Sequence, residues 1–455
     1  MRILFAAHQF FPEHYAGVEI VTLGLAKEFR ARGHETFVLA PKRSISGSGI
    51  EPGGIQDYEF EGVPVRRIGR PREGFRRPYR LDFENETMAR RAREYMREVR
   101  PDIVHAEHFQ GLSASVIPAF KETGAPLVYT ATDFWTMCPV VDRRRHDGVM
   151  CEGPEISHCV RCIASRHSGP RMAVIERTPG AALKAAGWLS EMPLVGNLRP
   201  LRQFGALKER PEVIREKMEQ VDHIIAYTSL MKELLLANGI GDGKIEVSPY
   251  GIDTSKITGI PPNTNVPPPL RIGFIGTISP HKGCDLLVRA FRKLPKNLEA
   301  TLAVHGNLER FEDFARELRR IAGGDKRIEF SGPFQRERVG DVLSELDVLV
   351  VPSRWYENQP GVILEAFAAG MPVVATDLGG MSEFVKHEEN GLLFEPDNAE
   401  DLARQLRRLG EEPGLLEKLR AGIGPVKTVR QDADELEKLY ASLVTTGSGE
   451  IGSRE

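Results

Sequence analysis

The sequence predicts an α/β protein made of two doubly wound domains. Short apolar runs alternate with longer helical patterns along almost the whole chain, which is typical of a mostly parallel sheet covered by helices on both faces. A segment with five prolines in residues 260–270 interrupts this alternation, and the alternation then restarts. A pattern that stops at an extended linker and begins again indicates two domains of the same class.

The first domain is predicted to span residues 1–258. It begins with a strand at residues 2–7 and an amphipathic helix at residues 17–32, which ends at Gly33. Its further strands are expected at residues 35–40, 102–105, 126–131, 223–227 and 244–247.

Residues 259–270 form the predicted linker, and residues 271–425 form the predicted second domain. Strands are expected there at residues 271–275, 299–304, 327–330, 348–351, 373–375 and 391–394. The Gly-, Ser- and Glu-rich residues 445–455 are expected to be disordered.

Composition excludes several classes of protein. With 41% hydrophobic and 27% charged residues, the 455-residue chain is globular. The 61 Lys and Arg residues against 64 Asp and Glu residues, a net charge of −3, argue against nucleic-acid binding driven by the overall field. No apolar stretch approaches the ~20 residues of a membrane span, and no secretory leader is visible. A cytoplasmic location is therefore expected.

Small, polar and glycine residues gather where the strands of the second domain end, at residues 276–282, 305–306, 331–332, 352–361 and 376–380. Ligands of open parallel sheets lie beyond these carboxyl ends. Any one of these loops is explained by ordinary turn chemistry. All five together favour a ligand-binding edge.

A helix that begins at Pro360 would leave the amides of Gly361, Val362 and Ile363 without partners in the helix. These amides and the helix dipole would form an anion site that suits a phosphate or diphosphate. Glycine at position 361 would let the anion approach closely.

Two glutamates flank this anion site. Glu365 is the only charged residue in an otherwise apolar helical stretch, residues 362–369, so we expect it to be buried with hydroxyl donors such as a ribose diol. Glu357 precedes the helix and is placed to meet a sugar. Lys282, in the loop after the first strand of this domain, would neutralise phosphate charge. A solvated Glu357, a structural Glu365 and an exposed Lys282 remain alternatives.

At this point the chain resembles a known family. The similar segments are residues 276–283 (Gly-Thr-Ile-Ser-Pro-His-Lys-Gly), the pair Glu357 and Glu365, and residues 379–383 and 390–394. In the first domain they are residues 11–19, 221–229 and 247–253. In this order and spacing they resemble the retaining glycosyltransferases of family 4, which have the GT-B fold of two facing Rossmann-like domains. The resemblance covers most of residues 1–443.

The resemblance implies roles for individual residues. Glu357 would contact the hydroxyls of the donor sugar and support the developing oxocarbenium charge, and Glu365 would bind the nucleotide ribose. Lys282 would be the phosphate cation. The amides of residues 359–362, from Gln359 through Gly361 to Val362, would hold the diphosphate. The remaining donor contacts would come from the loop with Gly276 and Thr277, from the base-facing segment 327–332 with Ser331, and from Gly17.

The resemblance also implies a mechanism and a last element. Family members retain the anomeric configuration, by attack on the face from which the phosphate leaves, and need no catalytic metal or other cofactor. Residues 426–444 would form a C-terminal helix that packs back on the first domain.

Two departures from the family pattern concern the site. Many members carry an Arg shortly before the Lys, where this chain has Thr277. Many also carry a His at the end of the strand at residues 126–131, where this chain has Thr132. Asp133 then becomes the nearest polar candidate for a catalytic role beside the sugar.

Four of the five cysteines, Cys138, Cys151, Cys159 and Cys162, fall within 25 residues, inside an insertion at about residues 138–210. The last pair has the C-x2-C spacing of tetrahedral metal sites, so a structural zinc ion is expected. Free or redox-labile thiols are the main alternative, and an iron–sulfur cluster is a more distant one.

Residues 163–210 combine apolar residues such as Trp188 and Leu194 with prolines and glycines, and residues 66–100 contain 12 Arg against 6 acidic residues. Together they would form a basic, apolar face for anionic lipid or a lipid-linked acceptor at the inner face of the cell membrane. The alternative is a solvated Arg-rich helix face and a lid over the acceptor.

The predicted function is a retaining glycosyltransferase that moves a hexosyl-type sugar from a nucleotide diphosphate sugar to a glycan or lipid-linked acceptor, in polysaccharide or glycolipid synthesis. A catalytically weakened, glycan-binding relative of the same fold is the alternative. An NAD-dependent oxidoreductase is disfavoured, because no G-x-G-x-x-G motif follows the first strand of either domain.

Overall fold

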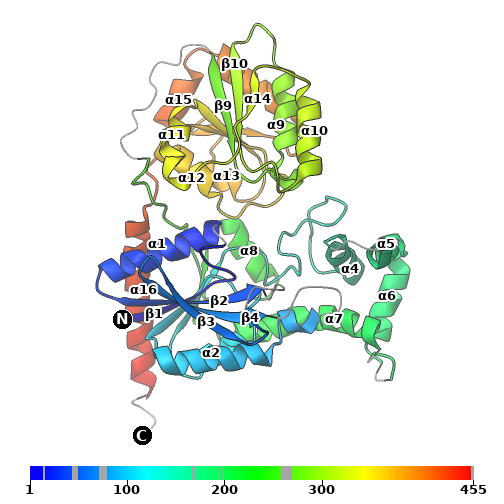
Figure 1. Cartoon of the computed structure of the whole chain (residues 1–455), viewed down its shortest axis with the longest axis vertical. Coiled ribbons are helices and arrows are strands. Elements are labelled where there is room, and N and C mark those ends of the chain that lie inside the picture. The colour runs from blue at the N-terminus through cyan, green and yellow to red at the C-terminus, as the bar shows by residue number, and fades with distance from the viewer. Residues whose placement is uncertain are drawn as a thin grey trace. The chain divides into compact units, whose positions relative to one another are not determined.

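The structure is a computed structural model, and it describes residues 1–13, 16–43, 50–70, 79–166, 170–192, 194–196, 198–257 and 269–451. The chain divides into two compact units (Figure 1). The first unit comprises residues 1–250 and 429–455, and the second comprises residues 251–428. Residues 259–268 of the predicted linker lie outside the described residues.

The first unit contains an eight-stranded sheet in the order β3-β4-β2-β1-β5-β6-β7-β8. All neighbouring strands are parallel except the hairpin formed by β3 and β4. The strands are β1 (Arg2–Ala6), β2 (Glu35–Arg43), β3 (Ile55–Phe60), β4 (Val63–Arg70), β5 (Ile103–Ala106), β6 (Leu127–Ala131), β7 (His223–Ala226) and β8 (Ile245–Val247).

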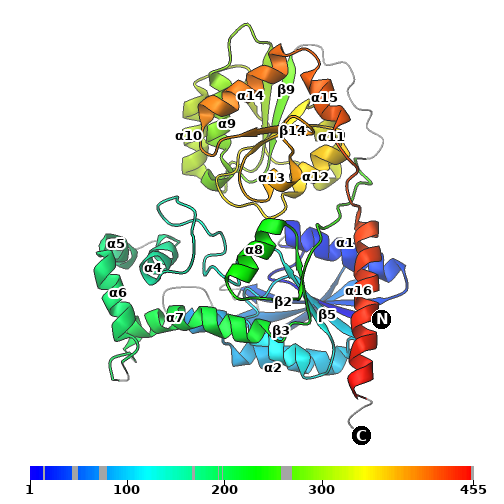
Figure 2. The ribbon, with the colours of Figure 1, turned by 180° about the vertical axis from the view of Figure 1, so that it is seen from behind.

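Helices cover this sheet and extend beyond it (Figures 1 and 2). Those nearest the sheet are α1 (Gly17–Ala31), η1 (Tyr79–Asp82), α2 (Glu86–Val99), α3 (Val116–Lys121), α8 (Ser229–Ala237) and α16 (Val429–Ile451). An arm of helices projects away from the sheet in both views and corresponds to the predicted insertion. It consists of α4 (Ile156–Ser165), α5 (Pro170–Arg177), α6 (Gly180–Leu189) and α7 (Arg199–Met218).

The hairpin of β3 and β4 was not predicted. Its turn residues Glu61 and Gly62 both have positive φ, 47° and 81°, as a two-residue hairpin turn requires. The side chains of Ile55–Phe60 alternate between exposed and half-buried positions, as expected for an edge strand. The Glu61-Gly62 pair, which follows a segment of alternating polar and apolar residues, could have indicated this hairpin.

The C-terminal helix α16 packs against α1 of the first unit. Tyr440 is fully buried, stacks on Phe29 with ring centroids 5.5 Å apart, and its hydroxyl bonds to His105 Nδ1. Residues 445–451 continue this helix, so the expected disorder is wrong for them. The hydroxyls of Thr445 and Thr446 donate to the carbonyls of Ala441 and Ser442, one turn earlier in the helix. Residues 452–455 lie outside the described residues.

The second unit contains a six-stranded, fully parallel sheet in the order β11-β10-β9-β12-β13-β14. The strands are β9 (Leu270–Ile275), β10 (Ala300–His305), β11 (Ile328–Phe330), β12 (Val348–Val351), β13 (Val373–Thr376) and β14 (Gly391–Phe394). The connecting helices are η2 (Pro280–Lys282), α9 (Cys284–Arg292), α10 (Glu312–Ala322), η3 (Arg336–Arg338), α11 (Val339–Ser344), α12 (Gly361–Ala368), α13 (Met381–Phe384), α14 (Ala399–Glu411) and α15 (Leu415–Ala421).

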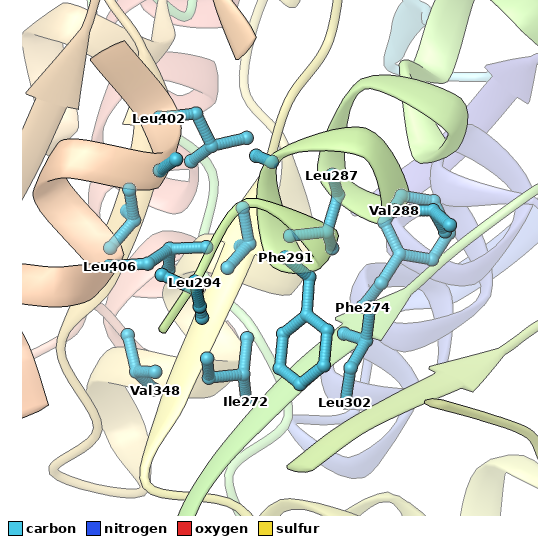
Figure 3. Close-up of a cluster of buried hydrophobic side chains, with 14 of the residues drawn as sticks. Ile272, Phe274, Leu287, Val288, Phe291, Leu294, Leu302, Val348, Leu402 and Leu406 are labelled. Carbon is cyan, nitrogen blue, oxygen red and sulfur yellow. The ribbon is translucent and has the colours of Figure 1, made fainter. Parts of the chain in front are cut away.

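The core of the second unit forms where α9 and α14 pack on one face of the sheet (Figure 3). Leu287 and Phe291 of α9 and Leu402 and Leu406 of α14 are fully buried against strand residues such as Ile272. A second apolar cluster, which includes Ile363 of α12, covers the other face. This doubly covered parallel sheet is the architecture that the sequence predicted.

Among the helices that the structure describes, none combines the length and the apolar character that a membrane crossing requires.

Candidate active site

The loops that follow the strands of the second unit meet at one edge of its sheet, because all six strands run in the same direction. The Gly276 amide donates to His305 O at 3.1 Å, and the Gly306 amide donates to Gly332 O at 3.0 Å. These bonds join the ends of β9, β10 and β11. Thr277 is half-buried in the first of these loops, and the Ser331 amide is bonded to the neighbouring strand.

Glu357 is the centre of a hydrogen-bond network in the loop after β12. Its carboxylate oxygen Oε1 accepts from Lys282 Nζ at 2.6 Å, from Ser353 Oγ at 2.6 Å and from Trp355 Nε1 at 2.7 Å. The residue is only 8% exposed. Burial opposes its ionisation, but attraction by Lys282 and the three hydrogen bonds outweigh burial, so the pKa of Glu357 lies below its ordinary value. The alternative of a solvated Glu357 is therefore wrong.

Lys282 is held at this position by its own loop. Its ammonium nitrogen lies 5.3 Å from the centroid of the Trp355 ring, and its side chain is 27% exposed. Gly283, which follows it, has φ of 68°, and a Cβ there would lie 1.9 Å from the carbonyl oxygen of Pro352. Only glycine therefore allows this loop to lie so close to the loop after β12.

The loop with Glu357 is also fixed from the other side. The Gly380 amide, just before α13, donates to the Glu357 carbonyl at 2.9 Å. A Cβ on Gly380 would lie 1.9 Å from Asn358 O. The backbone around Glu357 is therefore held between the loops that follow β9 and β13. Lys282 is partly exposed, so a ligand can reach the hydrogen-bond network from its side.

Helix α12 begins at Gly361, with Pro360 as its N-cap residue. The prediction that the helix starts at Pro360 is therefore wrong by one residue, because Pro360 has an extended ψ of 107°. The Ile363 amide is not available to an anion, since it donates to Pro360 O at 3.0 Å. Within the part of the chain that the structure describes, the amides of Gly361 and Val362 make no hydrogen bond. Two of the three amides predicted to bind an anion are therefore available to one.

Glu365 is 6% exposed on α12, as its apolar surroundings predicted. Its Oε1 accepts from Arg336 Nη2 at 2.6 Å, and this arginine lies in η3 with a side chain that is 47% exposed. The sequence did not identify Arg336, because Arg338 in the same short helix has the same local pattern. The structure thus places a second cation, Arg336, on the carboxylate of Glu365.

Asp133 in the first unit belongs to a cluster that the sequence identified only in part. Its Oδ2 accepts from His108 Nε2 at 2.5 Å, and its Oδ1 accepts from the Trp135 amide at 2.8 Å. Because His108 Nδ1 accepts from the Gln110 amide at 2.9 Å, the ring proton of a neutral His108 is on Nε2. His108 follows β5, the strand next to β6, and so brings an imidazole to the segment that begins at Thr132.

This cluster continues toward α1. The rings of His108 and His8 have centroids 4.7 Å apart, and His8 Nε2 lies 3.5 Å from Glu19 Oε1. Glu19 is fully buried and accepts from the Ala16 amide at 2.6 Å, which caps the helix that Gly17 begins. Burial raises the pKa of Glu19 despite these hydrogen bonds. His8 and His108 lie just after β1 and β5, so the strand-end rule that identified the second unit's loops could have found them, whereas Glu19 lies in the first turn of α1.

Models of two protein families match the sequence of the chain. The model described as "Glycosyl transferase 4-like domain" matches residues 16–251, more than half of the chain. The model described as "Glycosyl transferases group 1" matches residues 269–412. The chain belongs to the glycosyl transferase 4-like family.

Curated relatives of this glycosyltransferase are similar over part of their length. It is 33% identical over 144 residues to an uncharacterized glycosyltransferase of Methanocaldococcus jannaschii, a match that covers 32% of this chain and 36% of the relative. It is 31% identical to the D-inositol 3-phosphate glycosyltransferase of Rhodococcus jostii, with 46% and 49% covered. It is 27% identical to the amylovoran biosynthesis glycosyltransferase AmsK of Erwinia amylovora, with 57% and 69% covered. The chain thus spans half or less of the first two relatives.

Solved structures show the fold of this glycosyltransferase. Sucrose-phosphate synthase from Thermosynechococcus elongatus superposes with a TM-score of 0.63 at 18% identity, over 98% of this chain and 99% of that one. Anabaena HepE in complex with UDP and glucose superposes with a TM-score of 0.61 at 18% identity, over 97% and 99%. Both confirm the predicted GT-B fold.

The four clustered cysteines of the glycosyltransferase line one small cavity between the loop after β6 and α4. All are free thiols. Burial, and then the charges of neighbouring thiolates, raise the pKa of Cys159 to about 12 and that of Cys162 to about 11. In the described ranges no three His, Cys, Asp or Glu side chains are arranged to hold a metal ion. The zinc site therefore stays a prediction.

Many arginines of residues 66–100 do not contribute free charge to the predicted basic face. Arg66 and Arg67 are buried in β4, where Arg66 bonds to Asp57 and Glu98 and Arg67 bonds to Glu13. On α2 and η1, further arginines are neutralised by nearby glutamates, namely Arg80, Arg90, Arg91 and Arg93. The prediction is wrong for these residues because local acids pair with them; residues 71–78 lie outside the described residues.

Proposed function

We propose that this chain transfers a hexosyl-type sugar from a nucleotide diphosphate sugar to a glycan or lipid-linked acceptor, with retention of configuration and without a metal. The observation that carries the proposal is the buried, ionised Glu357, held by Lys282 beside the open amides of Gly361 and Val362. This arrangement combines an anion site with a carboxylate that faces the reacting sugar.

In this proposal the diphosphate lies at the start of α12. The amides of Gly361 and Val362 and the dipole of the helix favour the phosphate oxygens, and Lys282 adds a full positive charge. Gln359, 8% exposed in the same loop, supplies a further backbone contact. Glu365, whose Oε1 is bonded to Arg336, binds the ribose hydroxyls. Gly276, Thr277 and Ser331, at the same edge of the sheet, contribute to the phosphate and base contacts.

The proposed transfer breaks the bond between the anomeric carbon and the leaving phosphate oxygen, and the acceptor oxygen bonds to that carbon on the same face. The leaving phosphate oxygen takes the proton of the acceptor hydroxyl, so no separate base is required. Glu357 stabilises the positive charge that develops on the sugar, and Lys282 and the two amides stabilise the negative charge on the phosphate.

Relatives and structural neighbours support the donor and acceptor classes. HepE has been determined with UDP, with UDP and glucose, and with UDP-glucose, which makes a uridine diphosphate sugar the first donor to test. The proposed acceptor classes are consistent with AmsK, an amylovoran biosynthesis glycosyltransferase, and with the structural neighbour WaaB, a lipopolysaccharide outer core galactosyltransferase.

In the first unit, we assign Asp133 to the acceptor side, with Gly17 near the donor phosphates. Asp133 accepts a hydrogen bond from His108, which fixes the carboxylate for an acceptor hydroxyl. An Asp133→Asn variant should raise KM for the acceptor more than it lowers kcat. Equal kinetics with the unmodified protein would reject this role.

A panel of nucleotide sugars tests the proposed activity directly. We expect one of them to raise the melting temperature and to release free nucleotide when a glycan acceptor is added. Proton NMR of the product should show the donor's anomeric configuration, and EDTA should leave the rate unchanged. Binding of a glycan without nucleotide release from any donor would instead indicate the weakened, glycan-binding relative.

A further inference from the structure

The turn between α6 and α7 carries the largest local group of exposed apolar side chains in the described residues. Trp188 is 59% exposed, Leu194 93% and Leu198 57%, and Leu189 is also exposed. These four lie within eleven residues, whereas the other exposed large apolar residues of the described chain occur singly along the sequence. Scattered exposed apolar residues need no explanation, but a contiguous group indicates a binding surface.

Cations flank this turn on both helices. Lys184 lies one helical turn before Trp188 on α6, and Arg202 lies one turn after Leu198 on α7, so each cation shares a helix face with an exposed apolar residue. Both side chains are exposed. Lys184 Nζ lies 3.5 Å from Glu155 Oε1 at the surface, whereas Arg202 has no ion-pair partner among the described residues. Residues 170–208 contain six Lys or Arg residues against two Glu, a net charge of +4.

We propose that this turn is a peripheral docking site for a bilayer that contains anionic lipid. Exposed Trp and Leu side chains suit the boundary between headgroups and acyl chains, and Lys and Arg one turn away suit anionic headgroups. The charge of the segment complements such a membrane, and the projecting arm presents the turn away from the sheet of the first unit (Figures 1 and 2). The proposal does not rest on the transferase activity, because its test measures binding alone.

Flotation of the full chain with vesicles tests the site. We expect the protein to float with vesicles of phosphatidylglycerol and phosphatidylcholine, to stay in the soluble fraction with pure phosphatidylcholine, and to bind less at high salt. The double variant Trp188→Ser/Leu194→Ser should lower the partition coefficient about tenfold or more. Lys184→Gln/Arg202→Gln should lower it about tenfold on anionic vesicles.

The matched control is Leu236→Ser, which removes an exposed leucine of α8 outside the arm and should leave binding unchanged. Because Trp188 and Leu194 are exposed, their replacement should leave the melting temperature unaltered, and a melting curve checks this. Failure of the unmodified protein to float with anionic vesicles would overturn the proposal. So would equal flotation of the Trp188→Ser/Leu194→Ser variant, or sedimentation that shows the turn joining two copies of the chain instead.

Discussion

Lys282 Nζ lies 2.6 Å from Glu357 Oε1, and the two residues come from loops that follow the neighbouring strands β9 and β12. The pair places a cation and a carboxylate side by side at the proposed donor site. The same pair also keeps a buried glutamate ionised without a bound ligand. Replacing Lys282 or Glu357 is therefore expected to change both donor binding and the free energy of unfolding.

The first prediction concerns Lys282→Met. The variant leaves a buried carboxylate without its cation, which should cost about 3 kcal/mol of stability at neutral pH and lower the melting temperature by several degrees. In the unmodified protein the pKa of Glu357 lies below its ordinary value of 4.5. The ionised side chain therefore stabilises the folded state at pH values above 4.5, and this stabilisation is lost as the pH falls. Without Lys282, burial dominates and this local trend should reverse.

Melting curves between about pH 4 and 8 check this prediction. Lys386→Met, which removes an exposed lysine of the same unit, is the control and should melt like the unmodified protein. A Lys282→Met variant with unchanged melting at every pH would contradict the proposed pairing.

The second prediction concerns Arg336, which bonds to Glu365. If this pair binds the ribose and an adjacent phosphate, Arg336→Gln and Glu365→Gln should each weaken nucleoside diphosphate binding about ten- to a hundredfold, as expected for hydrogen bonds to charged groups. Calorimetric titration with UDP measures this. Arg338→Gln removes the neighbouring, exposed arginine of η3 and should bind normally; equal weakening by Arg338→Gln would reject the specific role of Arg336.

Features of the site that depend on one continuous segment were predicted from the sequence, and contacts between distant segments were not. Glu357, Glu365 and the start of α12 come from one continuous segment. The burial of Glu365 was predicted from it, and the helix start was wrong by one residue. Arg336 was not predicted, because its contact with Glu365 joins segments 29 residues apart and nothing distinguishes it locally from Arg338.

The same reason accounts for the other differences. Asp133 was identified from the segment that replaces a family His, but its partner His108 comes from another strand. The arginines of β4 looked like a basic surface, because the acids that neutralise them, Asp57 and Glu98, lie on other elements. The parallel sheets themselves were predicted well, since continuous apolar strands separated by helical patterns are a local signal.

The third prediction concerns Glu107, a fully buried residue after β5. Burial and the nearby Asp432 carboxylate raise its pKa to about 8, against the opposing hydrogen bond of Tyr227. The folded protein therefore binds a proton that the unfolded chain releases above pH 4.5, and stability should fall as the pH rises from there to about 8. Glu107→Gln should remove this decline and melt a few degrees higher at alkaline pH. A decline that persists unchanged in the variant would contradict the assignment.

The fourth prediction concerns the four clustered cysteines. Metal analysis of the purified chain should find about one zinc ion per molecule. The four thiols line one cavity, but no three of them are arranged around an ion in the described residues, so they would have to draw together when zinc binds. Cys159→Ser should lose it, whereas Cys284→Ser, in α9 of the other unit, should retain it. Zinc far below one equivalent in a folded protein, with all thiols titratable, would instead indicate free cysteines.

The most direct test of the account is donor-dependent nucleotide release by Glu357→Gln. The variant keeps the size of the side chain but loses the charge that would stabilise the sugar, so turnover should fall about a hundred- to a thousandfold. Nucleoside diphosphate binding should remain within a few-fold, because the amides of α12 are untouched, and Glu389→Gln, an exposed residue of the same unit, should be fully active. Turnover by Glu357→Gln equal to that of the unmodified protein would contradict the central claim.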